Sequence, residues 1–203
     1  MVEIGPGWGN YTIPLAEKYE RLTLVDVSPD NLAYLRSRTN SMGRTVHTVC
    51  SPWEEAKVLK ADLVFGYNCL YRVQEPELFL MKMHRTARKL CVIGMNRPPE
   101  LPWLKDLEDA GISLHYTRQG CEELLEIARE LGIPPRLVNV PNVRTYRNES
   151  EAALLKRAEG FLLKPCDRRK LMALLLPRHR QEADGRLSCE YRFFSQLLVW
   201  EPC

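Results

Sequence analysis

The 203-residue sequence lacks an apolar run long enough to span a bilayer, and it lacks the pattern of a secretory signal peptide. It begins within a segment that we expect to be a strand, which leaves no room for a targeting segment in this numbering. Internal repeats and low-complexity tracts are absent as well. These absences favour a globular protein with no membrane partner.

Paired cysteines are missing too. The seven cysteines are scattered, and no two have the Cys-x-x-Cys spacing. This argues against a disulfide framework and a zinc site, so we expect no metal and a reducing, cytoplasmic compartment. Nor is there a large excess of charge, because the net charge of +3 is too small to favour nucleic acid as the partner.

What the chain does have is a glycine-rich turn at its start. Val2 to Ile4 are typical of a strand end, residues 5–9 read Gly-Pro-Gly-Trp-Gly, and residues 10–19 are typical of a helix. Such a unit brings backbone N–H groups close to a ligand, because glycine has no Cβ atom in the way. The alternative is a plain connection that needs glycine only for its positive φ angles.

The next segment ends on an acid. Residues 22–27 form an apolar run typical of a strand buried on both faces of a parallel sheet, interrupted by Asp26. Ser28-Pro29-Asp30 then has the pattern of a helix start. An acid at this strand end lies beside the glycine turn in a doubly wound sheet, where it can bind ribose hydroxyls. The alternative is an acid that only caps the helix.

The pattern Glu3-x-Gly5-x-Gly7-x-Gly9, followed by Thr12 and then Asp26, resembles the class I S-adenosylmethionine-dependent methyltransferases. The NAD-binding fingerprint differs, because Asn10 stands where its third glycine would be. The resemblance implies that S-adenosylmethionine is the cofactor. It also implies that Glu3 organises the amino-acid end of the cofactor, the glycine turn packs against it, and Asp26 binds the ribose.

The resemblance extends through the next two expected strands, residues 45–49 and 61–68. Cys50 and Ser51 replace the family's usual acid, and Trp53 is expected either to face the adenine or to pack in the core. By position, Asn68 and Tyr71 point toward the transferred methyl group. The positions expected to bind cofactor are Glu3, Gly5, Pro6, Gly7, Gly9, Thr12, Asp26, Val27, Pro52, Trp53 and Asn68.

We therefore expect an α/β fold: a doubly wound, mostly parallel seven-stranded sheet, with a helical insertion before the last strand. Later strands are expected at 90–95, 136–146 and 189–200, and helices at 101–110 and 121–131. The chain is interpreted as one domain, 1–203, in which residues of about 148–182 form a helical cap over the substrate side. Basic residues in that cap either attract an acidic substrate or form a solvated face.

Methyl transfer from a sulfonium is an in-line displacement, so the protein mainly aligns the acceptor and excludes water. No catalytic residue is assigned. Tyr71, His84, His115 and Tyr146 are candidate bases by residue type alone, and Tyr71 and Tyr146 are the candidate substrate residues.

Several functions remain open at this point. The leading hypothesis is a methyltransferase acting on an unidentified small molecule; the alternatives are a non-catalytic methyltransferase-like binding module and an RNA or protein methyltransferase. A short-chain nicotinamide oxidoreductase would need a Tyr-x-x-x-Lys pair, which is absent. Because family members usually carry helices before the first strand, we expect weak activity from a chain that truly starts at Met1. The oligomeric state is not predicted.

Overall fold

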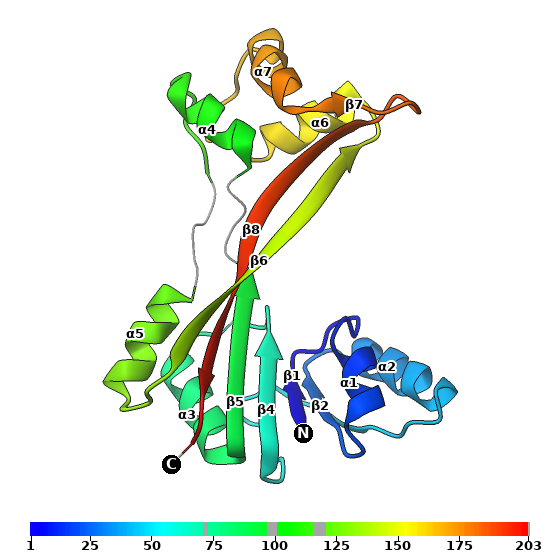
Figure 1. Cartoon of the computed structure of the whole chain (residues 1–203), viewed down its shortest axis with the longest axis vertical. Coiled ribbons are helices and arrows are strands. Elements are labelled where there is room, and N and C mark those ends of the chain that lie inside the picture. Colours follow the sequence, from blue (N-terminus) through cyan, green and yellow to red (C-terminus); the bar gives the residue numbers. More distant parts are fainter. Residues whose placement is uncertain (71–72, 97–100, 116–120, 203) are drawn as a thin grey trace. The chain divides into compact units, whose positions relative to one another are not determined.

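The computed structural model describes residues 1–70, 73–96, 101–115 and 121–202 (Figure 1). The chain divides into two compact units. Unit 1 comprises Met1–Met95, Gly120–Asn139 and Gln196–Cys203, and unit 2 comprises Asn96–Gln119 and Val140–Ser195. The expectation of a single domain with a cap at about 148–182 stays a prediction.

The strands form one mixed, mostly parallel sheet, as the sequence predicts. They are β1 (Val2–Ile4), β2 (Thr23–Asp26), β3 (His47–Cys50), β4 (Ala61–Tyr67), β5 (Ala87–Asn96), β6 (Arg136–Asn148), β7 (Arg180–Gln181) and β8 (Leu187–Trp200). Seven follow the order β3-β2-β1-β4-β5-β8-β6, and the two-residue strand β7 pairs with β8 in antiparallel fashion. The parallel order reverses between β1 and β4, and ligands bind at such a switch point in open α/β sheets.

Helices cover both faces of the sheet in unit 1. They are α1 (Thr12–Lys18), α2 (Pro29–Ser41), α3 (Pro76–Thr86) and α5 (Glu122–Glu130). Leu24 packs in a cluster with α1 and α2, whereas the next residue, Val25, packs in a cluster with α3 and α5. Successive strand residues point to opposite faces, so the two helix pairs lie on opposite sides of β2. This arrangement confirms the doubly wound fold.

Unit 2 has a hydrophobic core of its own. Its helices are α4 (Pro102–Asp109), α6 (Glu151–Glu159), α7 (Arg168–Leu175) and the 3-10 turn η1 (Leu176–Arg178). Ser150 caps α6 by accepting a hydrogen bond from the Ala153 N–H at 3.2 Å, and Asp167 caps α7 by accepting one from Lys170 at 2.9 Å. The sequence predicts both helices of the insertion but not their shared core with α4, which includes Leu107, Leu154 and Leu171.

Within the ranges that the structure describes, no helix is long and apolar enough to cross a membrane.

Candidate functional site

The glycine turn follows β1 directly, at the switch point of the sheet. Gly5, Gly7 and Gly9 all have positive φ angles, of 61°, 54° and 84°. A Cβ atom on Gly5 would lie 2.5 Å from the Cβ of Cys69, and one on Gly9 would lie 2.2 Å from the side chain of Leu35. A Cβ atom on Gly7, in contrast, would have no atom of the described residues within 4 Å. Gly5 and Gly9 therefore allow the turn to pack, while Gly7 leaves its backbone open to a ligand.

Glu3 lies beneath this turn and is only 2% exposed. Its carboxylate accepts a hydrogen bond from the Thr12 hydroxyl at 2.8 Å, so the first residue of α1 is tied to β1. Burial raises the pKa of Glu3 to about 7, against the partly opposing effect of the Thr12 hydrogen bond. Near neutral pH this buried carboxyl group therefore exchanges between its protonated and ionised forms.

Asp26, at the end of β2, is tied to the same turn. One carboxylate oxygen accepts a hydrogen bond from the Gly7 N–H at 3.2 Å, and the other accepts one from the Ser28 N–H at 2.8 Å. The Asp26 residue is 9% exposed, whereas Val27 beside it is 61% exposed. A carboxylate has about four lone-pair positions, so two are left to accept hydrogen bonds from a ligand with adjacent hydroxyl groups.

The end of β4 forms the other side of the switch point. Asn68 has a φ of 50°, and its backbone N–H donates to the Gly94 carbonyl at 2.8 Å. This left-handed backbone is uncommon outside glycine, although asparagine tolerates it better than most residues. The tight turn brings Cys69 back against Gly5.

Pro52 and Trp53 follow the end of β3. The backbone there is anchored by Ser51, whose N–H donates to the Asp26 carbonyl at 3.1 Å. Pro52 is exposed, but Trp53 is 3% exposed and its indole N–H donates to the Phe79 carbonyl at 3.1 Å. These contacts support the packing role that the sequence left open for Trp53, while its contact with adenine stays a prediction.

The residues proposed for the acceptor do not form one described group. Tyr71 lies outside the described residues. Tyr146 belongs to unit 2, where its ring stacks on Tyr191 at 4.9 Å and the Arg157 guanidinium lies 4.6 Å from the ring centre. The His84 Nδ1 atom is buried without a hydrogen-bond partner among the described residues, and His115 is exposed. In the described part of the chain, no contact of the His84 or His115 side chain marks either residue for catalysis.

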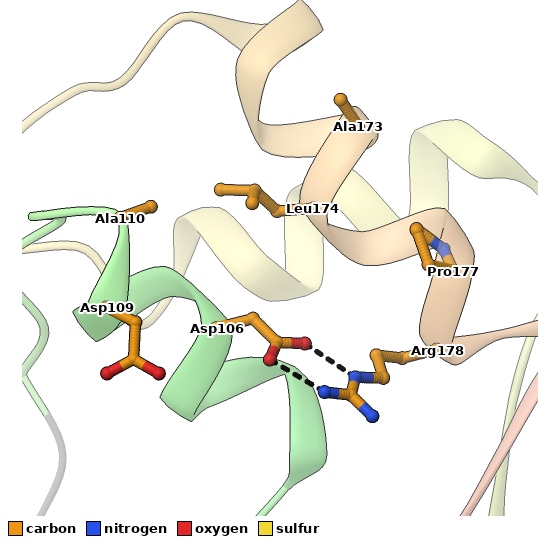
Figure 2. A pocket seen from close by; sticks show the side chains of 7 residues that line it. All are labelled: Asp106, Asp109, Ala110, Ala173, Leu174, Pro177 and Arg178. Carbon is orange, nitrogen blue, oxygen red and sulfur yellow. Dashed lines mark hydrogen bonds and ion pairs between the residues drawn. The ribbon is translucent and has the colours of Figure 1, made fainter.

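Unit 2 contains a shallow pocket of ≈ 490 Å³ (Figure 2). Across it, the Arg178 guanidinium donates two hydrogen bonds to Asp106, at 2.6 and 2.8 Å. This pair offsets the charge of Arg178, and elsewhere in unit 2 the Arg168 guanidinium is held by Glu159 at 2.8 Å. For these two arginines the structure supports a solvated, ion-paired face. We therefore place the candidate site at the glycine turn rather than at this pocket. Within the described ranges no group of side chains suits a metal ion.

Sequence reasoning missed an aromatic group beside the turn. The ring of Tyr11 lies 5.3 Å from Phe65 and 4.8 Å from Tyr67. Tyr11 directly precedes α1, and the other two share one face of β4 because they are two residues apart. The alternation in β4 was the signal that could have placed Phe65 and Tyr67 on one face of the strand, whereas the β1–β4 register sets that face level with Glu3.

Comparisons with known proteins agree with this geometry. Residues 1–89 match the family model described as a methyltransferase domain. Ribosomal RNA small subunit methyltransferase A from Leptothrix cholodnii is 31% identical over 164 residues, which are 71% of this chain and 55% of that protein. The chain thus spans about half the length of the curated relatives it matches.

Two solved structures share the fold over nearly the whole chain. A candidate methyltransferase from Bacillus halodurans C-125 aligns with a TM-score of 0.63 at 15% identity, covering 99% of this chain and 91% of that one. Magnesium protoporphyrin IX methyltransferase from Synechocystis PCC 6803, solved with bound S-adenosylhomocysteine, aligns with a TM-score of 0.55 at 12% identity. That alignment covers 100% of this chain and 73% of the Synechocystis protein.

Proposed function

We propose that the chain, whose residues 1–89 match the methyltransferase-domain model, is a class I S-adenosylmethionine-dependent methyltransferase that transfers the methyl group of its cofactor to a small-molecule acceptor. The observation that carries the proposal is the carboxylate of Asp26, held against the open backbone of Gly7 at the switch point of the sheet. A nucleoside placed there would offer its ribose hydroxyls to Asp26 and lie against the glycine turn.

The remaining cofactor contacts follow from the same geometry. The buried Glu3 would organise the amino-acid end of the cofactor through the turn and Thr12, which it holds by a hydrogen bond. Pro6 and Val27 flank the two strand ends, with Pro6 buried and Val27 exposed toward a ligand. Asn68 at the end of β4 would lie nearest the methyl group. Transfer then needs only an acceptor aligned with the sulfonium, because the cofactor supplies the electrophile.

A small-molecule acceptor is favoured by the modest charge of the chain. The net charge is +3, and the ion pairs of Arg168 and Arg178 reduce the basic surface that a nucleic acid would need.

Calorimetry with S-adenosylmethionine, S-adenosylhomocysteine and NAD tests the cofactor. We expect the first two to bind and NAD not to bind. Asp26→Asn should weaken binding about 10- to 100-fold, because a charged acceptor for the ribose hydroxyls is lost. The matched control is Asp30→Asn, since Asp30 is an exposed acid in the first turn of α2 and should leave binding unchanged. Equal effects of the two substitutions would contradict the ribose role of Asp26.

A second candidate function is methylation of RNA. The 31% identity with the ribosomal RNA methyltransferase of Leptothrix cholodnii favours it, over 71% of this chain. A screen that measures release of S-adenosylhomocysteine separates the two candidates. Turnover with small amines, phenols or carboxylates, and none with ribosomal RNA, would support the small-molecule proposal; the reverse result would replace it.

A further inference from the structure

The aromatic group beside the glycine turn consists of Tyr11, Phe65 and Tyr67, and we call it the tip aromatic cluster. The ring planes of Tyr11 and Phe65 make an angle of 66°, and those of Tyr11 and Tyr67 an angle of 53°. The two tyrosine hydroxyl groups also share a hydrogen bond. Tyr11 nevertheless remains 41% exposed, so part of its ring is available to a ligand.

The register of the sheet places this cluster at the proposed cofactor site. In the parallel pair of β1 and β4, Glu3 lies opposite Phe65, and Ile4 lies opposite Gly66. The next position in the same register sets Tyr67 level with Gly5, the first residue of the glycine turn. Tyr11 follows the last glycine of that turn by two residues, and its ring contacts that of Tyr67. The Tyr11 ring therefore lies beside the backbone that would hold the cofactor, and the Tyr67 ring packs against both Tyr11 and the Gly94 position of β5.

Acidic side chains lie near Cys69, which follows Tyr67 by two residues. Burial, together with the negative charges of Asp26, Glu3 and Glu54, raises the pKa of the neighbouring Cys69 thiol to about 12. Burial and Tyr67 also raise the pKa of Tyr11 to about 12, so its ring stays a neutral phenol at physiological pH. Aromatic ring faces attract cations.

We propose that the ring faces of Tyr11 and Tyr67 contact the sulfonium of the cofactor, so that this site binds cationic S-adenosylmethionine in preference to its neutral product, S-adenosylhomocysteine. The inference rests on the proposed function of the site. It assigns the two tyrosines a role in cofactor specificity: once the methyl group has left, the positive charge at sulfur is gone and so is the attraction that the rings supplied. Product release is then favoured by the same side chains that helped to bind the cofactor.

The test compares the dissociation constants of the two ligands, measured by calorimetry on the wild-type chain and its variants. The wild type should bind S-adenosylmethionine more tightly than S-adenosylhomocysteine. Tyr11→Leu and Tyr67→Leu should each reduce affinity for S-adenosylmethionine by about 3- to 30-fold and leave affinity for S-adenosylhomocysteine unchanged. Tyr11→Phe and Tyr67→Phe keep the rings and should keep the preference. Tyr19→Leu is the control, because Tyr19 is 38% exposed and follows the far end of α1.

The binding of S-adenosylhomocysteine also reports whether each variant still folds its site. If the leucine variants lose both ligands equally, or if the wild type binds both equally, the specificity role is wrong while the cofactor site stands. If the wild type binds neither ligand, the proposed function fails and the inference falls with it.

Discussion

Two tyrosine pairs in this chain have similar ring separations but different ring angles and different surroundings. In unit 1, the rings of Tyr11 and Tyr67 lie 4.8 Å apart and are tilted by 53°. In unit 2, the rings of Tyr146 and Tyr191 lie 4.9 Å apart, and the Arg157 guanidinium lies 4.6 Å from the ring of Tyr146. A hydrogen bond joins the hydroxyl groups in both pairs.

The difference appears in the titration of the two pairs. Burial raises the pKa of Tyr11 to about 12, and Tyr67 adds to this increase. Burial acts in the same direction on Tyr146, but hydrogen bonds with Tyr191 and Arg144 and the charges of Arg144 and Arg157 reverse it and lower the pKa of Tyr146. The hydrogen bonds and charges around a phenol therefore decide whether its pKa rises or falls from the usual value.

The largest expected effect is a loss of unfolding free energy when a turn glycine of either unit is replaced by alanine. Gly5→Ala introduces a Cβ atom 2.5 Å from the Cβ of Cys69 at a φ of 61°, whereas Gly185→Ala in unit 2 meets no described atom within 4 Å at a φ of 84°. We expect Gly185→Ala to cost about 1 to 2 kcal/mol of unfolding free energy and Gly5→Ala about 2 to 4 kcal/mol. Urea denaturation measures both values, and Gly7→Ala, with positive φ and open space, is a second control.

If Gly5→Ala and Gly7→Ala lower stability equally, the contact with Cys69 contributes nothing. The comparison then rests on backbone conformation alone.

The strand ends of unit 1 were largely predictable from the sequence, whereas the packing contacts within unit 2 were not. The glycine turn, Asp26 and the Ser28-Pro29 helix start are local patterns, and each has the expected backbone geometry. The core shared by Leu107 and Leu171, and the position of Arg157 over Tyr146, depend on contacts between segments far apart in sequence. Local propensity carries no information about such contacts.

Trp53 illustrates the same limit within unit 1. Its position after a strand suits either a ligand contact or the core, and only the acceptor of its indole N–H, the Phe79 carbonyl 26 residues away, distinguishes them. The aromatic group around Tyr11 was missed for a related reason, because the β1–β4 register decides which residues it meets.

The second prediction compares how one acid in each unit makes the unfolding free energy depend on pH. The pKa of Glu3 rises from 4.5 in its usual state to about 7 in the folded chain, mainly through burial. Folding therefore favours protonated Glu3. The contribution of this proton to the unfolding free energy is roughly 3 kcal/mol; it is complete below pH 4.5 and is lost as pH rises through 7. Glu3→Gln should remove this slope from unfolding free energies measured between pH 4.5 and 7.5.

Unit 2 should respond in the opposite direction and less strongly. A hydrogen bond from Arg178 lowers the pKa of Asp106. The stabilisation from ionised Asp106 is therefore present above the pKa of the unfolded chain and is lost as pH falls through the pKa of the folded chain. Its size is limited because the pair is solvent-accessible. Asp106→Asn should therefore leave the slope between pH 5 and 7 unchanged, and a change equal to that of Glu3→Gln would contradict the assignment.

The smallest expected effect is spectroscopic and tests the tyrosine comparison itself. In an ultraviolet titration of phenolate absorbance, Tyr146 should ionise below the usual pKa of 10, whereas Tyr11 and Tyr191 should ionise near 12. Tyr146→Phe should remove the earliest component of the curve. Arg144→Gln should move that component to higher pH, because a donor to the Tyr146 hydroxyl is lost, while Arg192→Gln, at an exposed arginine on β8, should not. If the early component persists in Tyr146→Phe, the arginines of unit 2 do not distinguish its tyrosine pair from the one at the glycine turn.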